Sequence, residues 1–573
     1  MEMSLLDFLI FIPLIAALLV AILPSKYSDK FKIIALGASA LQIVVAAFLY
    51  YGFDTSASAP TGVSHLSQFQ FVTKMDWISM NLGTLGELSI DYFVGVDGLS
   101  VTMVFLTVIV MLIGVIASWK VTEKTKAYFA LYLILNSAVI GCFTALDMFL
   151  FYLFFEFMLL PMYFLIGIWG GARREYASIK FFLYTLLGSV FILVVMIGLY
   201  SSVIDPIATG LMMDETNVAT IQDMLKNGLI DQQYLVHTFD MVLMTNPANY
   251  IPESMFGFVN DTSLLGVPIR LMAFLILFIG FAIKIPVVPV HTWLPDAHVE
   301  ASTPISVVLA GVLLKVGGYG LIRVGYAIFP DGAVHWAWLI GGLGVLSIIY
   351  GGLNALASQD LKRMIAYSSV SHMGFVLLGL ASVTVEGVSG AVYQMFSHGI
   401  ISSSLFLIAG VLYDRTHDRM INNYSGLATK MPQYTVIVVI TFFASLGLPG
   451  FSGFIAEILV FLGAFKSFTI NQLLPRWMAI VATLGLLLSA AYYLWTIQRM
   501  YFGEFKVRES DWKESLTDLT KREYIMFVPL IIMMLLFGVF PQILLDFSNT
   551  SIEYFVNMVN EQGLINLKNI LPN

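Results

Sequence analysis

Charged side chains are scarce in this 573-residue chain: Asp, Glu, Lys and Arg together make up 12% of it, against 58% hydrophobic residues. Soluble globular proteins contain about 25% charged and about 45–50% apolar residues, so this composition argues against a set of ordinary soluble domains. We predict a single polytopic membrane protein. The formal net charge of −8 says little about a partner, because the placement of Lys and Arg matters more in membrane proteins.

Cysteine is almost absent, and so are the usual cofactor motifs. The single thiol, Cys142, excludes an intrachain disulfide and the four-cysteine set that holds most iron–sulfur clusters. We expect Cys142 to be a small packed side chain. The sequence also has no P-loop, no CxxC, no metal-spaced His/Cys cluster and no strand-led GxGxxG. Energy for any transport must therefore come from a partner protein or from the gradient of another ion.

The apolar residues occur in continuous runs of about 20 rather than in alternation, which favours helices over a closed barrel. The first run, MEMSLLDFLIFIPLIAALLVAILP, has an acidic start and no cleavage signature, so we expect a retained span. We predict an all-α polytopic fold of about fourteen transmembrane helices. They are expected near 5–24, 31–51, 96–119, 127–146, 148–168, 178–203, 268–293, 301–327, 335–357, 364–384, 388–412, 434–465, 477–499 and 524–545.

The positions of Lys and Arg predict the orientation of these spans. With the N-terminus outside, the inner side carries 20 of the 29 basic residues and the outer side carries 7, while Lys284 and Lys315 lie within spans. This asymmetry follows the positive-inside rule and indicates that both termini lie outside. Two long polar segments, 52–95 and 204–267, then fall on the outer side, where we expect a cap without chemistry.

Two of the predicted helices are interrupted. Pro286 and Pro289 break the seventh span, and Pro449 and Gly450 break the twelfth. Because five spans separate them, the two broken helices run in opposite directions, as inverted-topology repeats require. Broken helices at corresponding positions indicate a site near the middle of the membrane.

The breaks suggest how the chain is organised. We predict one integral membrane domain over 1–573, with two inverted five-helix repeats at 127–327 and 335–502. N-terminal helices over 1–126 precede them. An inner loop, the fourteenth helix and an outer tail follow over 503–573.

Six ionisable residues lie inside or near predicted spans, one on each of six helices. An ionised side chain at the bilayer centre costs about 2.5–3.5 kcal/mol on insertion scales, so several of them together indicate a shared function. We expect proline to free the carbonyls of Ala282 and Ile285, which makes a hydratable pocket beside the seventh helix's charge. The hypothesis is a lateral proton path through Glu156, Lys284, Lys315, His372, His398 and Glu457, in which Glu156 partners Lys284.

These residues occur within motifs that resemble a known family. The segment KIPVVPVHTWLPDAHVEASTPISVVLAGVLLKVGGYGLIR (284–323) is similar to the signature of the antiporter-like, proton-translocating subunits of respiratory complex I. The resemblance covers nearly the whole chain and includes FFEFMLLPMYFLIGIWGG, QDLKRMIAYSSVSHMGF and GLPGFSGFIAE. Glu457, where sibling subunits have lysine, and the end of the chain without a long lateral helix favour the M-type branch. The AST at 301–303, where the family often has APT, is a departure that touches none of the ionisable residues.

The resemblance implies an activity and a set of partners. It implies a subunit of NADH:quinone oxidoreductase that has no redox centre of its own. NADH, FMN, iron–sulfur clusters and quinone are then expected in partner subunits. L- and N-type neighbours, the lipid bilayer, protons and water are the implied partners, without nucleic acid, in a bacterial inner membrane. It also assigns roles: Glu156 and Lys284 as an ion pair, Lys315 as the central lysine, His372 and His398 as connections, and Glu457 at the outlet.

Two alternatives to this reading stay open. A subunit of a multi-subunit cation/proton antiporter shares the fold and the motifs. A related complex could take its electrons from ferredoxin or a hydrogenase partner instead of NADH. A purely structural scaffold is disfavoured by the cost of the six buried ionisable residues.

Overall fold

Long apolar helices make up most of the computed structural model, which describes residues 4–56, 68–81, 87–260 and 262–571. Within these ranges, thirteen helices are long and apolar enough to cross a membrane, and they match every predicted span except the seventh. Several consist of consecutive labelled segments. The labels are α1 (Leu5–Ile22), α2 (Ser28–Gly52), α3 (Gly98–Ala117), α4 (Thr125–Thr144), α5 (Met148–Phe157) with α6 (Leu159–Trp169), α7 (Arg174–Tyr200), α13 (Thr303–Val308) with α14 (Leu314–Gly320), α16 (Ala337–Ala357), α17 (Leu361–Ala381), α18 (Val385–Thr416), α20 (Ser452–Ile470), α21 (Arg476–Ala482) with α22 (Leu484–Thr496), and α24 (Lys521–Val539).

The seventh span is broken, as the sequence predicts. Helix α11 (Ile269–Lys284) has 16 residues, about 24 Å at 1.5 Å per residue, which is less than the hydrocarbon thickness of a typical bilayer. The chain then leaves the helix and resumes as α12 (Trp293–Glu300). The twelfth span divides in the same way between α19 (Pro432–Ser445) and α20. The predicted all-helical membrane fold with two discontinuous helices is confirmed.

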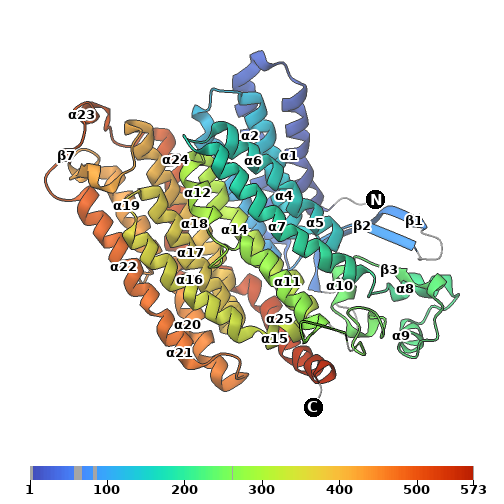
Figure 1. Ribbon diagram of the computed structural model, residues 1–573. Coiled ribbons are helices and arrows are strands. Elements are labelled where there is room, and N and C mark those ends of the chain that lie inside the picture. Colours follow the sequence, from blue (N-terminus) through green and yellow to red (C-terminus); the bar gives the residue numbers. More distant parts are fainter. Residues whose placement is uncertain (1–3, 57–67, 82–86, 261, 572–573) are drawn as a thin grey trace.

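The helix ends define two faces of the molecule. A β-hairpin of β1 (Gln70–Asn81) and β2 (Glu87–Val96) extends beyond the helices at one end (Figure 1). The segment from α7 to α11 lies at the same end, and the start of α1 and the end of α25 lie toward it. We call this end the hairpin face. The segment contains α8 (Pro206–Met212), α9 (Val218–Lys226), β3 (Val236–His237), α10 (Met241–Met244), β4 (Ser263–Leu264) and β5 (Val267–Pro268).

The opposite end, which we call the basic face, carries Lys26, Lys120, Arg173, Arg419 and Arg522. Strand β6 (Tyr424–Ser425) pairs there with β7 (Lys506–Val507), next to the short α23 (Trp512–Ser515). Helix α11 begins at the hairpin face, whereas α19 begins at the basic face. The two broken helices therefore approach the middle of the molecule from opposite ends, as predicted.

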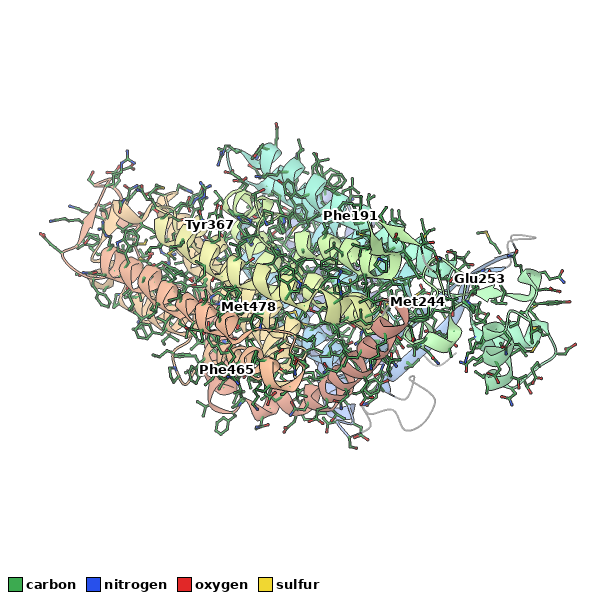
Figure 2. All side chains as sticks on the ribbon, turned by 60° about the horizontal axis from the view of Figure 1, so that its bottom comes forward. Phe191, Met244, Glu253, Tyr367, Phe465 and Met478 are labelled. Carbon is green, nitrogen blue, oxygen red and sulfur yellow. The ribbon has the colours of Figure 1, made fainter. Side chains whose placement is uncertain are left out.

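The helices are layered by burial. The span from α13 to α14, together with α17 and α18, is buried almost all round, whereas α7 and α20 expose much of their apolar surface. Figure 2 shows Phe191 of α7 and Phe465 of α20 along the helical part of the molecule, and Glu253 in the part that projects beyond the helices. The exposed apolar flanks suit contact with lipid or with other membrane helices. The ionisable residues of the inner helices are shielded from both.

A long C-terminal helix closes the hairpin face. Helix α25 (Gln542–Ile570) packs against α3, α18 and the short α15 (Pro330–His335). Ser551 of α25 accepts a hydrogen bond from the backbone N–H of Gly98 at 3.1 Å. The predicted outer tail is thus helical over most of its length and packs against the start of the third span.

Candidate functional site

Lys315 lies at the centre of the bundle. It is fully buried, its ammonium donates to the carbonyl of Ala310, and its Nζ lies 2.7 Å from His398 Nδ1. The helix around it is irregular, with π-helical turns over Leu309–Leu313 and Leu321–Tyr326 on either side of α14. Such turns are rare and occur frequently at functional sites. The sequence predicted the lysine but not the π-helical turns.

A line of polar side chains continues from His398 across two further helices. The rings of His398 on α18 and His372 on α17 are 5.6 Å apart. His372 Nδ1 lies 3.8 Å from a carboxylate oxygen of Glu457 on α20, and 3.1 Å from the amide nitrogen of Gln394. Its Nε2 lies 3.4 Å from the hydroxyl of Ser445 at the end of α19. Lys315, His398, His372 and Glu457 therefore form one continuous series of close neighbours.

The break in the twelfth span makes room for the carboxylate of Glu457. Gly447 has a φ of +78°, and a Cβ on it would lie 2.1 Å from Glu457 Oε2. Any other residue would clash with the carboxylate as well as strain the backbone. Pro449 and Gly450 complete the turn before α20 begins at Ser452. The sequence predicted this break at the correct place.

Lys284 ends α11 and is buried, with 2% of its surface exposed. Its ammonium lies 4.3 Å from the centre of the Phe155 ring and has no hydrogen-bond partner. Glu156 interacts with it electrostatically, but this carboxylate lies beside Ser189 of α7 and its Oε1 also lacks a partner. The described residues show no direct ion pair between these two side chains, and the Lys284 ammonium lies over the Phe155 ring instead.

One prediction about the seventh-span break is wrong. Pro286 does not free the carbonyl of Ala282, because that carbonyl accepts a hydrogen bond from the N–H of Val287 at 2.9 Å. The neighbouring carbonyl of Ile283 accepts from the indole N–H of Trp293 at 2.8 Å. Around the proline, the backbone hydrogen bond therefore spans five residues instead of four. The carbonyl of the next residue is bonded by a side chain of α12.

The predicted fifth span, 148–168, is one membrane-length helix over Met148–Trp169, with a single irregular residue inside it. Helix α5 ends at Phe157 and α6 begins at Leu159, directly after Glu156. Pro161 has no N–H to offer the carbonyl of Phe157, four residues earlier, so the regular bonding must fail there. The motif MLLP carries this local signal within a span whose place the sequence predicted correctly.

The two groups of ionisable residues lie on helices in contact. Gly317 of α14 packs so closely on α11 that a Cβ would lie 2.9 Å from the nitrogen of Ile285 and 3.0 Å from Lys284 Cβ. The structure therefore brings four of the six predicted residues into one series and places Glu156 and Lys284 beside it. In the described part of the chain, no group of three or more His, Cys, Asp or Glu side chains could hold a metal ion.

Comparison with known proteins shows the family to which the chain belongs. The model of a family described as "NADH:quinone oxidoreductase/Mrp antiporter, TM" matches residues 145–484. NADH-quinone oxidoreductase subunit M of Rhodobacter capsulatus is 40% identical over 557 residues, 96% of this chain and 96% of that protein. NAD(P)H-quinone oxidoreductase chain 4-3 of Nostoc sp. is 38% identical and covers 86% of this chain and 77% of its own length.

Two solved structures share the fold. A chain of respiratory complex I from Thermus thermophilus, solved with bound NADH, has a TM-score of 0.73 at 27% identity, covering 97% of this chain and 99% of its own. A chain of the Mrp complex from Dietzia sp. also has a TM-score of 0.73, at 20% identity, covering 97% and 98%. The second likeness concerns the fold alone.

Proposed function

The chain belongs to the NADH:quinone oxidoreductase/Mrp antiporter family, among its M-type membrane subunits, and we propose that it moves protons through its buried Lys, His and Glu side chains. In this proposal the chain carries no redox centre. Partner subunits, with their NADH, FMN, iron–sulfur clusters and quinone, supply the energy. This chain supplies the membrane path.

The observation that carries the proposal is the series Lys315, His398, His372 and Glu457 inside the bundle. A lysine can donate a proton, and each neutral imidazole can accept one at one nitrogen while it releases another from the second nitrogen. The carboxylate of Glu457 can then take the proton. Every step connects near neighbours with separations of 2.7–3.8 Å, or rings 5.6 Å apart, so small side-chain movements or single waters suffice.

Lys284 and Glu156 control the entry to this series in the proposal. The ammonium of Lys284 has no hydrogen-bond partner, so its charge depends on how closely Glu156 approaches. An opposite charge nearby favours the ionised form of both groups, and its withdrawal favours release of the proton. Pro161 removes one helical hydrogen bond just after Glu156, so this part of the helix bends more easily.

The surroundings follow from the same reasoning. We place the basic face inside and the hairpin face, with both termini, outside a bacterial inner membrane. The exposed apolar flanks are assigned to lipid and to L- and N-type neighbours. The divisions at 127–327 and 335–502 are proposed as the two inverted repeats, each with one broken helix.

The first prediction tests the pair at the entry. Lys284→Ala in the assembled complex should lower proton pumping and the coupled reduction of quinone about tenfold or more, since it removes a proton donor and acceptor. Glu156→Gln, which keeps the shape of the side chain, should act in the same direction. Both rates are measured in membrane vesicles with assembly checked on native gels. Full pumping by an assembled Lys284→Ala complex would remove this residue from the path.

A subunit of a cation/proton antiporter is the second candidate, because the Mrp complex shares the fold over nearly the whole chain. Relatives at 37–40% identity across 96% of the chain are named as quinone oxidoreductase subunits. Purification of the intact complex separates the two: flavin and iron–sulfur absorbance accompanies the first candidate and not the second.

A further inference from the structure

A buried ion pair between Arg323 and Asp97 lies on the hairpin-face side of the central lysine. Arg323 follows Lys315 in the same span, within the π-helical turns over Leu321–Tyr326, and Asp97 caps the start of α3. Their side chains are 10% and 4% exposed, and Arg323 Nη2 lies 2.7 Å from a carboxylate oxygen of Asp97. A pair this deep is costly to desolvate and adds little stability over apolar packing, so a functional explanation is needed.

The same guanidinium binds two buried hydroxyl groups. Arg323 Nε donates to the hydroxyl of Tyr319 at 3.2 Å, and its Nη2 donates to the hydroxyl of Ser100 at 3.3 Å. These two hydroxyls lie 2.9 Å apart, and that of Ser100 also donates to Asp97 at 3.1 Å. Tyr319 follows Lys315 at the i, i+4 spacing that puts both on one face of α14. Hydroxyl groups therefore lead from the face of the central lysine to the ion pair.

A cavity of about 40 Å³ reaches the ion pair from the hairpin face. Asp97 and Arg323 line it, together with Ser551 of the C-terminal helix α25. The space is large enough for water, and the charged and hydroxyl groups of its lining suit water as a ligand. Arg323 and Tyr319 therefore stand between a hydratable space at the hairpin face and the central Lys315.

We propose that Arg323 is a charge barrier that stops protons from passing between Lys315 and the hairpin face. The hydroxyl oxygens of Tyr319 and Ser100 already accept hydrogen bonds from the guanidinium, so they are poor acceptors for a further proton. An extra proton there would also be repelled by a guanidinium that never loses its charge. A fixed arginine excludes protons from some membrane pores in the same way.

The barrier gives the proton path its direction. Asp97 holds the guanidinium in place. A proton on Lys315 cannot leave toward the hairpin face, so it continues to His398, which is 2.7 Å away. Protons outside cannot return to Lys315 by the same short route. The inference rests on the proposed proton path.

The test measures passive proton leak in liposomes that contain the purified, assembled complex, with quinone reduction inhibited. The double variant Arg323→Gln with Asp97→Asn removes both charges and keeps groups that can form hydrogen bonds. An imposed pH gradient should decay about tenfold faster than with the unmodified complex, because the repulsion between like charges is lost. Without the inhibitor, fewer protons should be pumped for each NADH oxidised. A gradient that decays at the unmodified rate would overturn the barrier.

Two controls separate a barrier from a structural role. Arg323→Lys keeps a positive charge and should keep the gradient stable, so a leak as large as that of the double variant would contradict the inference. Arg270→Gln with Asp331→Asn removes another buried pair, 3.0 Å apart, whose arginine bonds to the carbonyl of Phe256. It should add no leak. Equal leaks in the two double variants would show that lost packing, and not the lost charge of Arg323, lets protons through.

Lys315→Ala, measured in parallel, separates this inference from the proposed function. Full pumping by Lys315→Ala would contradict the proposed path itself. Loss of pumping in Lys315→Ala, together with a stable gradient in the assembled double variant at Arg323 and Asp97, would overturn only the barrier. If that double variant fails to assemble, Arg323→Gln alone is measured in the same way, and a stable gradient overturns the barrier there too.

Discussion

At the residue scale, the account depends on side chains whose charge is held without the usual partners. Lys284 and Glu457 both have a buried charged atom that lacks a hydrogen bond. Such groups are costly in a structural role, because an unpaired buried charge destabilises the fold. They are suited to gaining and losing a proton, because no strong partner fixes their charge. This difference leads to specific expectations for single substitutions.

Glu457 offers a test by exchange of one titratable group for another. Glu457→Lys should retain a substantial part of proton pumping, whereas Glu457→Ala should lower it about tenfold or more, since alanine cannot take up a proton. Pumping and quinone reduction are compared in the same vesicles. Equal pumping by both variants would mean that a titratable group is not needed at this position.

Asp147 provides a prediction for pH at the hairpin face. It caps α5 by accepting from the N–H of Leu150 at 2.9 Å, and burial raises the pKa of its carboxyl to about 7, with the carboxylates of Asp91 and Asp240 adding to the effect. The folded state therefore binds this proton more tightly than the unfolded state does. Its contribution to stability falls as the pH rises between the ordinary carboxyl pKa and about 7.

Asp147→Asn should remove this dependence while it keeps an oxygen for the helix cap. At pH 8 the variant should show slower hydrogen exchange than the unmodified protein in residues 87–96 and at the start of α5. At pH 5.5 the two should exchange alike. Faster exchange in the variant at pH 8 would show that the ionised carboxylate stabilises this end of the molecule.

At the element scale, the breaks in the seventh and twelfth spans are built differently. Around Pro286, the backbone and Trp293 donate hydrogen bonds to the nearby carbonyls. The carbonyls at this break therefore have partners within the protein. At the second break, glycine with a positive φ lets Glu457 lie against the main chain. The sequence predicted both places from proline and glycine, but it could not predict how the freed groups find partners, because those partners come from other helices.

Gly447 and Gly450 make a matched pair for testing the second break. Both have positive φ values, +78° and +98°, but only a Cβ on Gly447 would meet Glu457, while Gly450 has open space around it. Alanine at either position should cost about 1–2 kcal/mol in backbone strain. Gly447→Ala should also displace the carboxylate and lower pumping more than Gly450→Ala does. Equal pumping by the two assembled variants would contradict the role given to this contact.

At the scale of the whole molecule, much of the fold follows from the sequence. Apolar runs predicted the spans, and proline and glycine residues predicted the two breaks. The basic residues predicted which helix ends share a face. The hairpin of β1 and β2 was not predicted, because its segment reads only as polar. The helical tail α25 was missed as well, since its pattern is amphipathic and its packing surface lies on helices far away in the sequence.

The candidate site was predicted residue by residue but not as an arrangement. The charges stood out because they are rare in apolar runs, and four of the six do lie in one series. Gln394, which contacts His372, was not singled out, because a polar residue on a buried helix is noticed only when its neighbours are known. The contact of the Lys284 ammonium with the Phe155 ring likewise cannot be read from spacing along the chain.

The central claim is that protons cross this subunit by way of Lys315. The most direct measurement is the initial rate of proton uptake by vesicles, recorded with the rate of NADH oxidation, for the assembled Lys315→Ala complex. The account predicts that proton uptake falls about tenfold or more, with coupled NADH oxidation falling beside it. Unchanged proton uptake and an unchanged ratio of protons to NADH in a fully assembled Lys315→Ala complex would contradict it.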